Sequence, residues 1–286
     1  MLSEGFLQRL DALRLTLRAP AQGGAGGLRR SKALGTSVEF SDFREYAPGD
    51  DLRRLDWNAY ARFDRLFLKL FMEEQETQVN LLVDASASMA ERGKWQTAQS
   101  LAQLFAYLAL RGGDRVTLYA LGSDARYTPS LSGRADYMRA ASFLEGVMPG
   151  GEVRLCEAVQ RLPLRAGRGI TVLITDLMSP DGYEKALQSL QYRKQEVTLL
   201  HVLSPWEMQP EIEGMVRLID SETGEARELL ISGDMLKSYQ EALKALLEGA
   251  EAFCHGREMA YVRLLSDIDL EGEALRVLSR AGVVGA

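Results

Sequence analysis

The strongest constraint on the fold is a regular alternation of strand-like and helix-like segments from residue 79 to the end of the chain. The strand-like segments are short and continuously apolar, and those between them repeat apolar residues at helical spacing. Strands that are apolar on both faces are typical of a parallel sheet covered by helices on each side. We therefore expect an α/β fold with a doubly wound, mostly parallel sheet. The expected strands are residues 79–83, 115–121, 169–175, 196–203 and 260–265, and the expected helices are residues 95–110, 134–147, 155–162, 181–192, 234–253 and 270–281.

One segment interrupts this alternation. Residues 214–220 and 226–231 have strand character, and Ser-Glu-Thr-Gly at 221–224 is typical of a turn. We expect an inserted β-hairpin, within an insertion of about residues 206–233, and the alternation resumes after it.

An amino-terminal segment, residues 1–33, precedes the predicted domain of residues 79–286. It combines an amphipathic helix over 2–17 with a flexible, glycine-rich linker over 19–27. The segment is locally basic. We favour a helix docked on the domain with its arginines in solvent, and contact with anionic lipid or an acidic partner surface is the alternative.

A second extension, residues 34–78, is dense in charged and aromatic residues and ends in an extended stretch over 65–78. We expect it to pack on the core of the domain. Its charged residues favour an ion-paired clamp, and a surface for a partner is the alternative. The residues of this predicted network are Asp50, Asp51, Arg53, Arg54 and Asp56.

Composition excludes several classes of protein. A net charge of -6 and a pI of about 5.2 argue against a nucleic-acid-binding protein. No secretory signal and no apolar run of roughly 18 residues is visible, so we expect a cytoplasmic protein without a transmembrane segment, and peripheral attachment to a membrane stays open. The two cysteines and two histidines lack zinc-site spacing, and two isolated cysteines favour a reducing compartment.

The most informative candidate site follows the first predicted strand. Residues 81–89 read Leu-Leu-Val-Asp-Ala-Ser-Ala-Ser-Met, which places Asp84, Ser86 and Ser88 at the carboxyl end of that strand. Open α/β sheets bind ligands at this end of their strands. One carboxylate and two hydroxyls offer only oxygen, which Mg²⁺ prefers. Capping of the following helix and turn by the same side chains is the structural alternative.

A strand that ends in Asp-x-Ser-x-Ser resembles the metal-ion-dependent adhesion site of von Willebrand factor A domains. The resemblance implies the Rossmann-type fold of that family and a site for Mg²⁺ or Mn²⁺. The two serines would bind the metal directly, and the aspartates would act mostly nearby or through water. A second-loop threonine, a third-loop aspartate and a partner's carboxylate complete the family's pattern. Asp176, after the apolar strand 172–175, matches the third-loop aspartate.

The second loop departs from that pattern. Residues 149–155 read Pro-Gly-Gly-Glu-Val-Arg-Leu and offer no hydroxyl where the family has threonine. We expect Glu152 to supply a carboxylate instead, although Arg154 nearby would repel a cation. Weak metal binding, or a metal lost altogether, therefore stays open. The predicted metal ligands are Asp84, Ser86, Ser88, Asp176 and Glu152.

Residues 39–62, together with Asp-Ala-Ser-Ala-Ser at 84–88, resemble the bacterial family known as domain of unknown function fifty-eight. The resemblance runs from about residue 35 to near the end of the chain. It implies a von Willebrand-type adaptor that works beside a MoxR-type AAA+ ATPase in the chaperone-like assembly or maturation of other proteins. The client or partner would donate a carboxylate to the metal.

Three functions remain to be weighed. The favoured one is a metal-dependent protein-binding adaptor that is not an enzyme. A metal-free scaffold with the same fold is the first alternative, because the second-loop threonine is missing. A metal-dependent phosphohydrolase is the last, because Ser86 stands where such enzymes usually carry a second aspartate. No catalytic and no cofactor-binding residue is predicted.

Overall fold

The computed structural model describes residues 1–16, 39–47, 55–63, 65–72, 76–164 and 167–285. The chain divides into two compact units. The main unit comprises Met1–Gly27 and Thr77–Ala286, and the small unit comprises Leu28–Glu76. None of the described helices combines the length and the apolarity that a membrane crossing requires.

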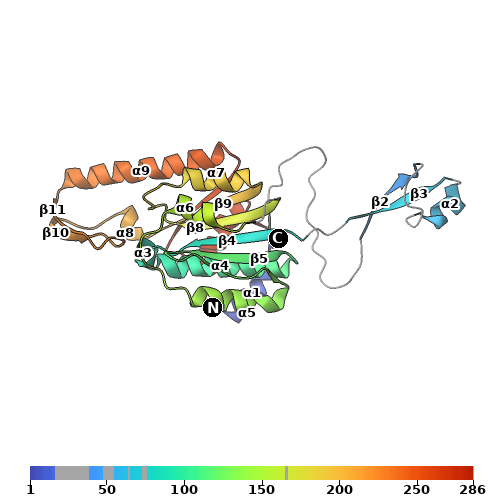
Figure 1. The fold of residues 1–286 in the computed structure, drawn as a ribbon, viewed down its shortest axis with the longest axis horizontal. Helices are drawn as coiled ribbons and strands as arrows, with labels where there is room; N and C mark the ends of the chain where they lie inside the picture. Colours follow the sequence, from blue (N-terminus) through green and yellow to red (C-terminus); the bar gives the residue numbers. More distant parts are fainter. Residues whose placement is uncertain (17–38, 48–54, 64, 73–75, 165–166, 286) are drawn as a thin grey trace. The chain divides into compact units, whose positions relative to one another are not determined.

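The main unit is built on a seven-stranded sheet with the order β12-β9-β8-β4-β5-β6, in which β7 also pairs with β5. The five long strands are parallel, and Figure 1 shows β9, β8, β4 and β5 side by side. The short β6 and β7 run antiparallel to β5 at one edge. The strands are β4 (Gln78–Asp84), β5 (Arg115–Leu121), β6 (Arg126–Tyr127), β7 (Leu131–Ser132), β8 (Gly169–Thr175), β9 (Gln195–Leu203) and β12 (Ala260–Leu265).

The strand order reverses between β4 and β8. The chain adds β5 on one side of β4 and then crosses to β8 on the other side. This is the order of doubly wound Rossmann-type sheets, which bind ligands at the reversal. The register pairs Val83 of β4 with Ile174 of β8, so Asp84 and Asp176 come to the same edge. The predicted von Willebrand factor A-like α/β fold is confirmed.

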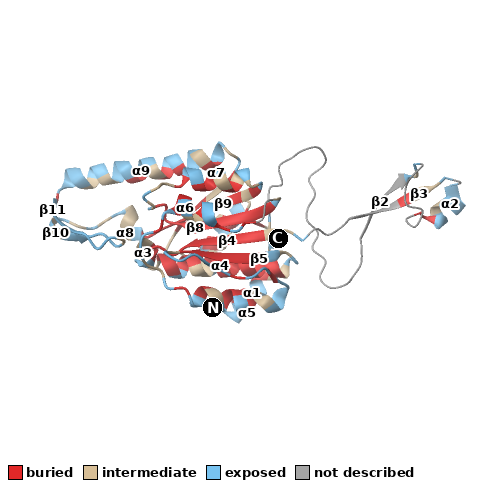
Figure 2. Ribbon diagram, viewed as in Figure 1, coloured by how far each residue is buried: buried red, intermediate tan, exposed pale blue. Residues whose placement is uncertain are grey.

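Helices cover both faces of the sheet, because alternate side chains of each strand point to opposite sides. In β4, Leu81 and Val83 enter one apolar cluster and Leu82 enters the other. Each fully buried leucine or phenylalanine stabilises the fold by about 1.5–3 kcal/mol. Figure 2 shows the central strands buried between these layers. The first cluster is covered by α4 (Lys94–Arg111), α5 (Tyr137–Glu145) and α10 (Leu275–Arg280), and the second by α6 (Leu155–Arg161), α7 (Glu184–Tyr192) and α9 (Gly233–His255).

Four short helical segments complete the main unit. Two of them, α3 and α8, follow strands at the carboxyl edge of the sheet, and the other two precede α5 and α10. They are α3 (Ala87–Ala90), α8 (Pro205–Met208), a 3-10 turn (Arg134–Asp136) and a π-helical turn (Leu270–Ala274).

The amino-terminal helix is shorter than predicted and is docked. The helix α1 (Glu4–Leu10) begins after Ser3, whose hydroxyl accepts a hydrogen bond from the Phe6 backbone N–H. Phe6 and Leu10 are fully buried in the first cluster. Beyond it, β1 (Arg14–Leu15) pairs with β13 (Val284–Gly285), which ends the predicted helix before residue 17. The predicted linker over 19–27 lies outside the described residues.

The inserted hairpin is confirmed. The strands β10 (Gly214–Ile219) and β11 (Ala226–Ile231) pair with each other in an antiparallel sheet of two. The carboxylate of Asp220 closes the turn, because its Oδ1 accepts hydrogen bonds from the backbone N–H groups of Glu222 and Thr223.

In the small unit, β2 (Glu39–Glu45) pairs with β3 (Phe67–Met72), and α2 (Trp57–Phe63) lies between them in the chain. Asp56 precedes α2, and its carboxylate accepts hydrogen bonds from two backbone N–H groups of that helix. The rest of the predicted ion-pair network, Asp50 to Arg54, lies outside the described residues. That this segment packs on the core stays a prediction.

Candidate metal and partner site

Asp84 ends β4 and is buried at the strand reversal. Its Oδ2 accepts a hydrogen bond of 2.7 Å from the Thr175 hydroxyl, and its Oδ1 accepts one of 3.0 Å from the Ser86 backbone N–H. Burial and the negative charge of Asp176 raise the pKa of Asp84 to about 6, and the hydrogen bonds from Thr175 and Ser86 oppose that rise. The ionised carboxylate would be stabilised by a nearby cation.

The two serines of the motif stand side by side. The Ser86 Oγ and Ser88 Oγ atoms lie 3.0 Å apart, and the Ser86 side chain makes no capping hydrogen bond to α3. Two neighbouring ligands of an octahedral Mg²⁺ ion, each about 2.1 Å from the metal, are separated by about 3 Å. The hydroxyl spacing therefore matches an edge of such a coordination shell, and the capping alternative fails for Ser86.

Asp176 follows β8 and is already paired with a cation of the chain. Its Oδ2 lies 2.8 Å from the Lys94 Nζ, and its Oδ1 accepts a hydrogen bond from the Met178 backbone N–H. The backbone of Leu177 adopts φ = 61°, a left-handed conformation that bulky residues rarely take and that clusters at functional sites. Asp176 is thus held firmly at the site, but its carboxylate is not free.

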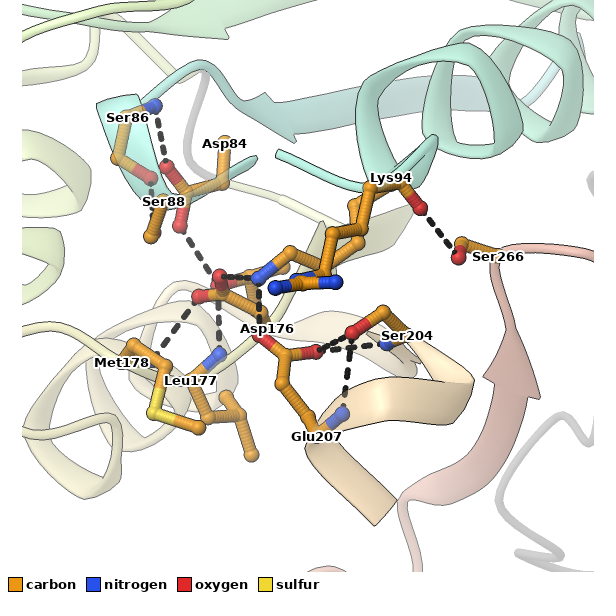
Figure 3. A network of polar contacts seen from close by, with 12 residues as sticks. Asp84, Ser86, Ser88, Lys94, Asp176, Leu177, Met178, Ser204, Glu207 and Ser266 are labelled. Atoms are coloured by element: carbon orange, nitrogen blue, oxygen red, sulfur yellow. Dashed lines mark hydrogen bonds and ion pairs between the residues drawn. The ribbon is translucent and has the colours of Figure 1, made fainter. Parts of the chain in front are cut away.

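The buried ammonium of Lys94 is the site residue that the sequence did not reveal. The Lys94 side chain is 1% exposed and bridges Asp176 and Glu207, whose Oε1 lies 2.6 Å from Nζ (Figure 3). Burial alone would lower the pKa of Lys94, but the two carboxylates raise it, so the group stays charged. Glu207 is in turn fixed by a capping box with Ser204 at the start of α8.

Sequence signals for these partners are weak. Ser-x-x-Glu at 204–207 is the signature of a capping box and could have located Glu207 on a helix start. Nothing in that signature indicates a lysine 113 positions earlier as its partner. The predicted helix also began at residue 95, one position after Lys94.

The second loop approaches the first through its backbone. The Ala87 N–H donates to the Gly151 carbonyl at 2.9 Å, and the Gly150 N–H donates to the Ala85 carbonyl at 2.8 Å. Glu152 is exposed, and its Oε1 lies 3.3 Å from the Arg154 Nε. The loop thus frames the site without a hydroxyl, and the carboxylate predicted as a ligand is paired with arginine.

Only the first loop, residues 84–88, offers oxygen ligands that suit a small hard cation. Ser86 and Ser88 offer two hydroxyl oxygens at a suitable spacing, and the buried Asp84 adds a carboxylate in the same loop. Among the residues that the structure describes, no three acidic, histidine or cysteine side chains converge closely enough to hold a metal ion. A cation here would therefore depend on the serine hydroxyls and on a further oxygen ligand from beyond the first loop.

Comparison with known proteins places these features in a family. The model of a family described as "Protein of unknown function DUF58" matches residues 42–246. Uncharacterised proteins of Mycobacterium tuberculosis and Mycobacterium bovis are each 27% identical over 280 residues, which is 94% of this chain and 88% of theirs.

Two solved structures resemble the chain distantly. An aerotolerance-related membrane protein of Bacteroides fragilis is 20% identical, with a TM-score of 0.42 over 72% of this chain and 98% of its own. The von Willebrand factor A domain of SpRpn10 is 9% identical, with a TM-score of 0.38 over 70% of this chain and 94% of its own. Neither likeness bears on what this chain binds.

Proposed function

This chain belongs to the DUF58 family of proteins of unknown function, and on that premise we propose that it is a non-enzymatic adaptor that binds a protein partner at the strand reversal. The observation that supports this proposal best is the pair of hydroxyls, Ser86 and Ser88, 3.0 Å apart beside the buried Asp84. Mg²⁺ or Mn²⁺ held there would join the adaptor to a carboxylate of the partner. The proposed partner is a MoxR-type AAA+ ATPase, together with a client protein.

The residues of the proposed site have different roles. Ser86 and Ser88 would hold the cation. The negative charge of Asp84 would stabilise it, and this charge is shielded from water because Asp84 is buried. Asp176 would act more remotely, because Lys94 already neutralises it. We do not place Glu152 among the direct ligands, since Arg154 pairs with it.

A metal-free scaffold is the second candidate, and Lys94 is the observation that favours it. The Lys94 ammonium lies between the carboxylates of Asp176 and Glu207, and Asp176 is the residue that matches the third-loop aspartate. A fixed positive charge of the chain therefore stands beside this aspartate without a metal ion. Hydrolysis through Asp84 has less support, because both oxygens of this buried carboxylate already accept hydrogen bonds and are poorly placed for nucleophilic attack.

Calorimetric titration of Mg²⁺ and then Mn²⁺ into chelator-stripped protein tests the proposal. We expect saturable binding by the wild type that is lost in Ser86→Ala and Asp84→Asn. The matched control is Ser142→Ala, an exposed serine on α5, which should bind the cation like the wild type. The titration is repeated with the purified ATPase present, because a partner's carboxylate completes the proposed shell. Absence of binding under both conditions would sink the metal-dependent adaptor and favour the scaffold.

A further inference from the structure

An arginine and a tryptophan stack on each other at the carboxyl edge of the sheet. The guanidinium carbon of Arg92 lies 4.0 Å from the centroid of the Trp206 ring. Arg92 belongs to the turn between α3 and α4, which follow β4, and Trp206 belongs to α8, which follows β9. Arg92 is exposed and Trp206 is partly buried. A cation that faces solvent therefore rests on an aromatic surface that the fold supplies.

The backbone of Arg92 is held in a costly conformation. Its φ is 51°, in the left-handed region that long side chains rarely adopt and that clusters at functional sites. The Arg92 carbonyl accepts a hydrogen bond of 2.7 Å from the Ser266 hydroxyl, and the Ser266 carbonyl accepts one of 2.7 Å from the Thr97 hydroxyl. Because Ser266 directly follows β12, these two bonds tie the turn and the start of α4 to the end of that strand.

A buried ion pair fixes the two halves of the stack against each other. Lys94, two positions after Arg92, binds Glu207, one position after Trp206, with 2.6 Å between Nζ and Oε1 (Figure 3). Glu207 also belongs to the capping box that starts α8. The same contact that joins α4 to α8 therefore sets Arg92 on Trp206. The stack is organised before any ligand arrives, which lowers the entropy lost on binding.

The hydrogen-bonding edge of this guanidinium is available. In the described part of the chain the contact of the Arg92 side chain is the stack on Trp206, and no carboxylate pairs with it. A guanidinium is planar and carries five N–H donors in its plane, so stacking through one face leaves those donors free. Two of them match the two oxygens of a carboxylate.

The charge of the surroundings favours a carboxylate over a phosphate. Glu91 directly precedes Arg92, and Asp84 and Glu207 are carried at the same edge of the sheet. The whole chain has a net charge of -6. A phosphate with nearly two negative charges would be repelled more strongly by these groups than a carboxylate with one.

We propose that Arg92 and Trp206 form a recognition site for an acidic side chain of a protein partner. The guanidinium donates two hydrogen bonds to the carboxylate, and the indole ring holds the guanidinium in position. This inference goes beyond the proposed function, because it requires no cation at Ser86 and Ser88. It shares with that function only that the ligand is a protein.

The test uses chelator-treated protein at pH 7 and the blocked peptide acetyl-Gly-Glu-Gly-amide, with acetyl-Gly-Gln-Gly-amide as its neutral counterpart. The acetyl methyl signal of the peptide, followed by NMR, gives the affinity for each variant. The glutamate peptide should bind the wild type saturably and shift the indole N–H signal of Trp206. Its affinity should fall about tenfold in Arg92→Gln and stay unchanged in Arg280→Gln, an exposed arginine at the end of α10.

Trp206 is a positioning residue, and a pair of variants separates that role from a structural one. Trp206→Leu should weaken binding of the glutamate peptide about threefold, because the stacking surface is lost. Trp206→Phe should restore most of the affinity, since it returns an aromatic face to the guanidinium. Equal binding by both variants would overturn the role of the ring.

Three other results would overturn the recognition site. The first is equal affinity of the wild type for the glutamate and glutamine peptides, and the second is an equal loss in Arg92→Gln and Arg280→Gln. The third is tighter binding of the corresponding phosphoserine peptide, which would assign the site to a phosphorylated partner. Because the chelator removes metal ions, these results do not depend on the Mg²⁺ titration that tests the proposed function, and either proposal can fail alone.

Discussion

The two ends of the central sheet solve the problem of buried polar groups in different ways. At the amino ends of β4, β8 and β9 the buried polar side chains are neutral. Gln195 Oε1 accepts hydrogen bonds from Asn80 at 3.0 Å and from Thr171 at 3.1 Å, and its Nε2 donates to the Gly167 carbonyl. At the carboxyl ends the buried polar groups include charged ones, and Lys94 bridges two carboxylates there.

The difference separates a network of neutral groups from a network that carries net negative charge. Neutral amides and hydroxyls can satisfy one another completely, so the amino end needs nothing from outside the chain. At the carboxyl end, Lys94 carries the one buried ammonium among the described residues, and a single positive charge cannot balance Asp84, Asp176 and Glu207 together. The cation site that we propose would draw on this uncompensated negative charge.

Removal of the buried ammonium should have the largest effect. Lys94→Met leaves Asp176 and Glu207 without their cation in a buried position, and breaking such a pair costs about 3–5 kcal/mol. We expect that loss in the free energy of unfolding, measured by urea denaturation at pH 7. Lys244→Met, which removes an exposed lysine paired with Glu248 on α9, should cost less than about 0.5 kcal/mol. A similar small cost for both variants would refute the charged bridge.

The neutral network should be less sensitive. Gln195→Met keeps the length of the side chain but leaves the Asn80 and Thr171 donors without their shared acceptor. We expect a loss of about 2–3 kcal/mol in unfolding free energy and no change in Mg²⁺ affinity. Gln240→Met on the exposed side of α9 is the matched control. Altered Mg²⁺ binding in Gln195→Met would show that the two ends of the sheet are not independent.

The smallest effect concerns His201, which joins β9 to the charged end. Its Nε2 lies 3.0 Å from the Asp176 carbonyl and its Nδ1 lies 2.9 Å from the Tyr261 hydroxyl. Burial lowers the pKa of His201 to about 4, and the Asp176 carbonyl and charge oppose that shift. Since the unfolded chain takes up a proton below pH 6.5 and the folded chain does not, stability is lost as the pH falls from about 6.5 toward 4.

Between pH 7 and pH 5 this linkage should cost the wild type about 2 kcal/mol more than His201→Gln. Urea denaturation of both proteins at the two pH values measures the difference. Parallel loss of stability in the two proteins would mean that His201 is not a buried neutral group, and that the charged end is more open to solvent than the structure shows.

Much of the architecture could be predicted because it depends on patterns of residues that are close together in the sequence. Five apolar strands and the hairpin at 214–231 follow from periodicity and turn composition, and the structure confirms them. The amino-terminal helix was predicted too long, because its apolar spacing continues to Leu17 although the chain leaves the helix to pair with β13. Strand pairing between the two ends of a chain leaves no local signal.

The candidate site likewise has a part that could be predicted from local sequence and a part that could not. The sequence by itself determined that Asp84, Ser86 and Ser88 lie at the end of a buried strand, because the motif and the strand are contiguous. Only the tertiary structure decided that Lys94 neutralises Asp176, 82 positions away, and that Glu207 of α8 lies against the same ammonium, 113 positions from Lys94. Electrostatic partners at such separations are chosen by the order of strands in the sheet and by the path of an insertion, and neither is encoded in the residues next to them.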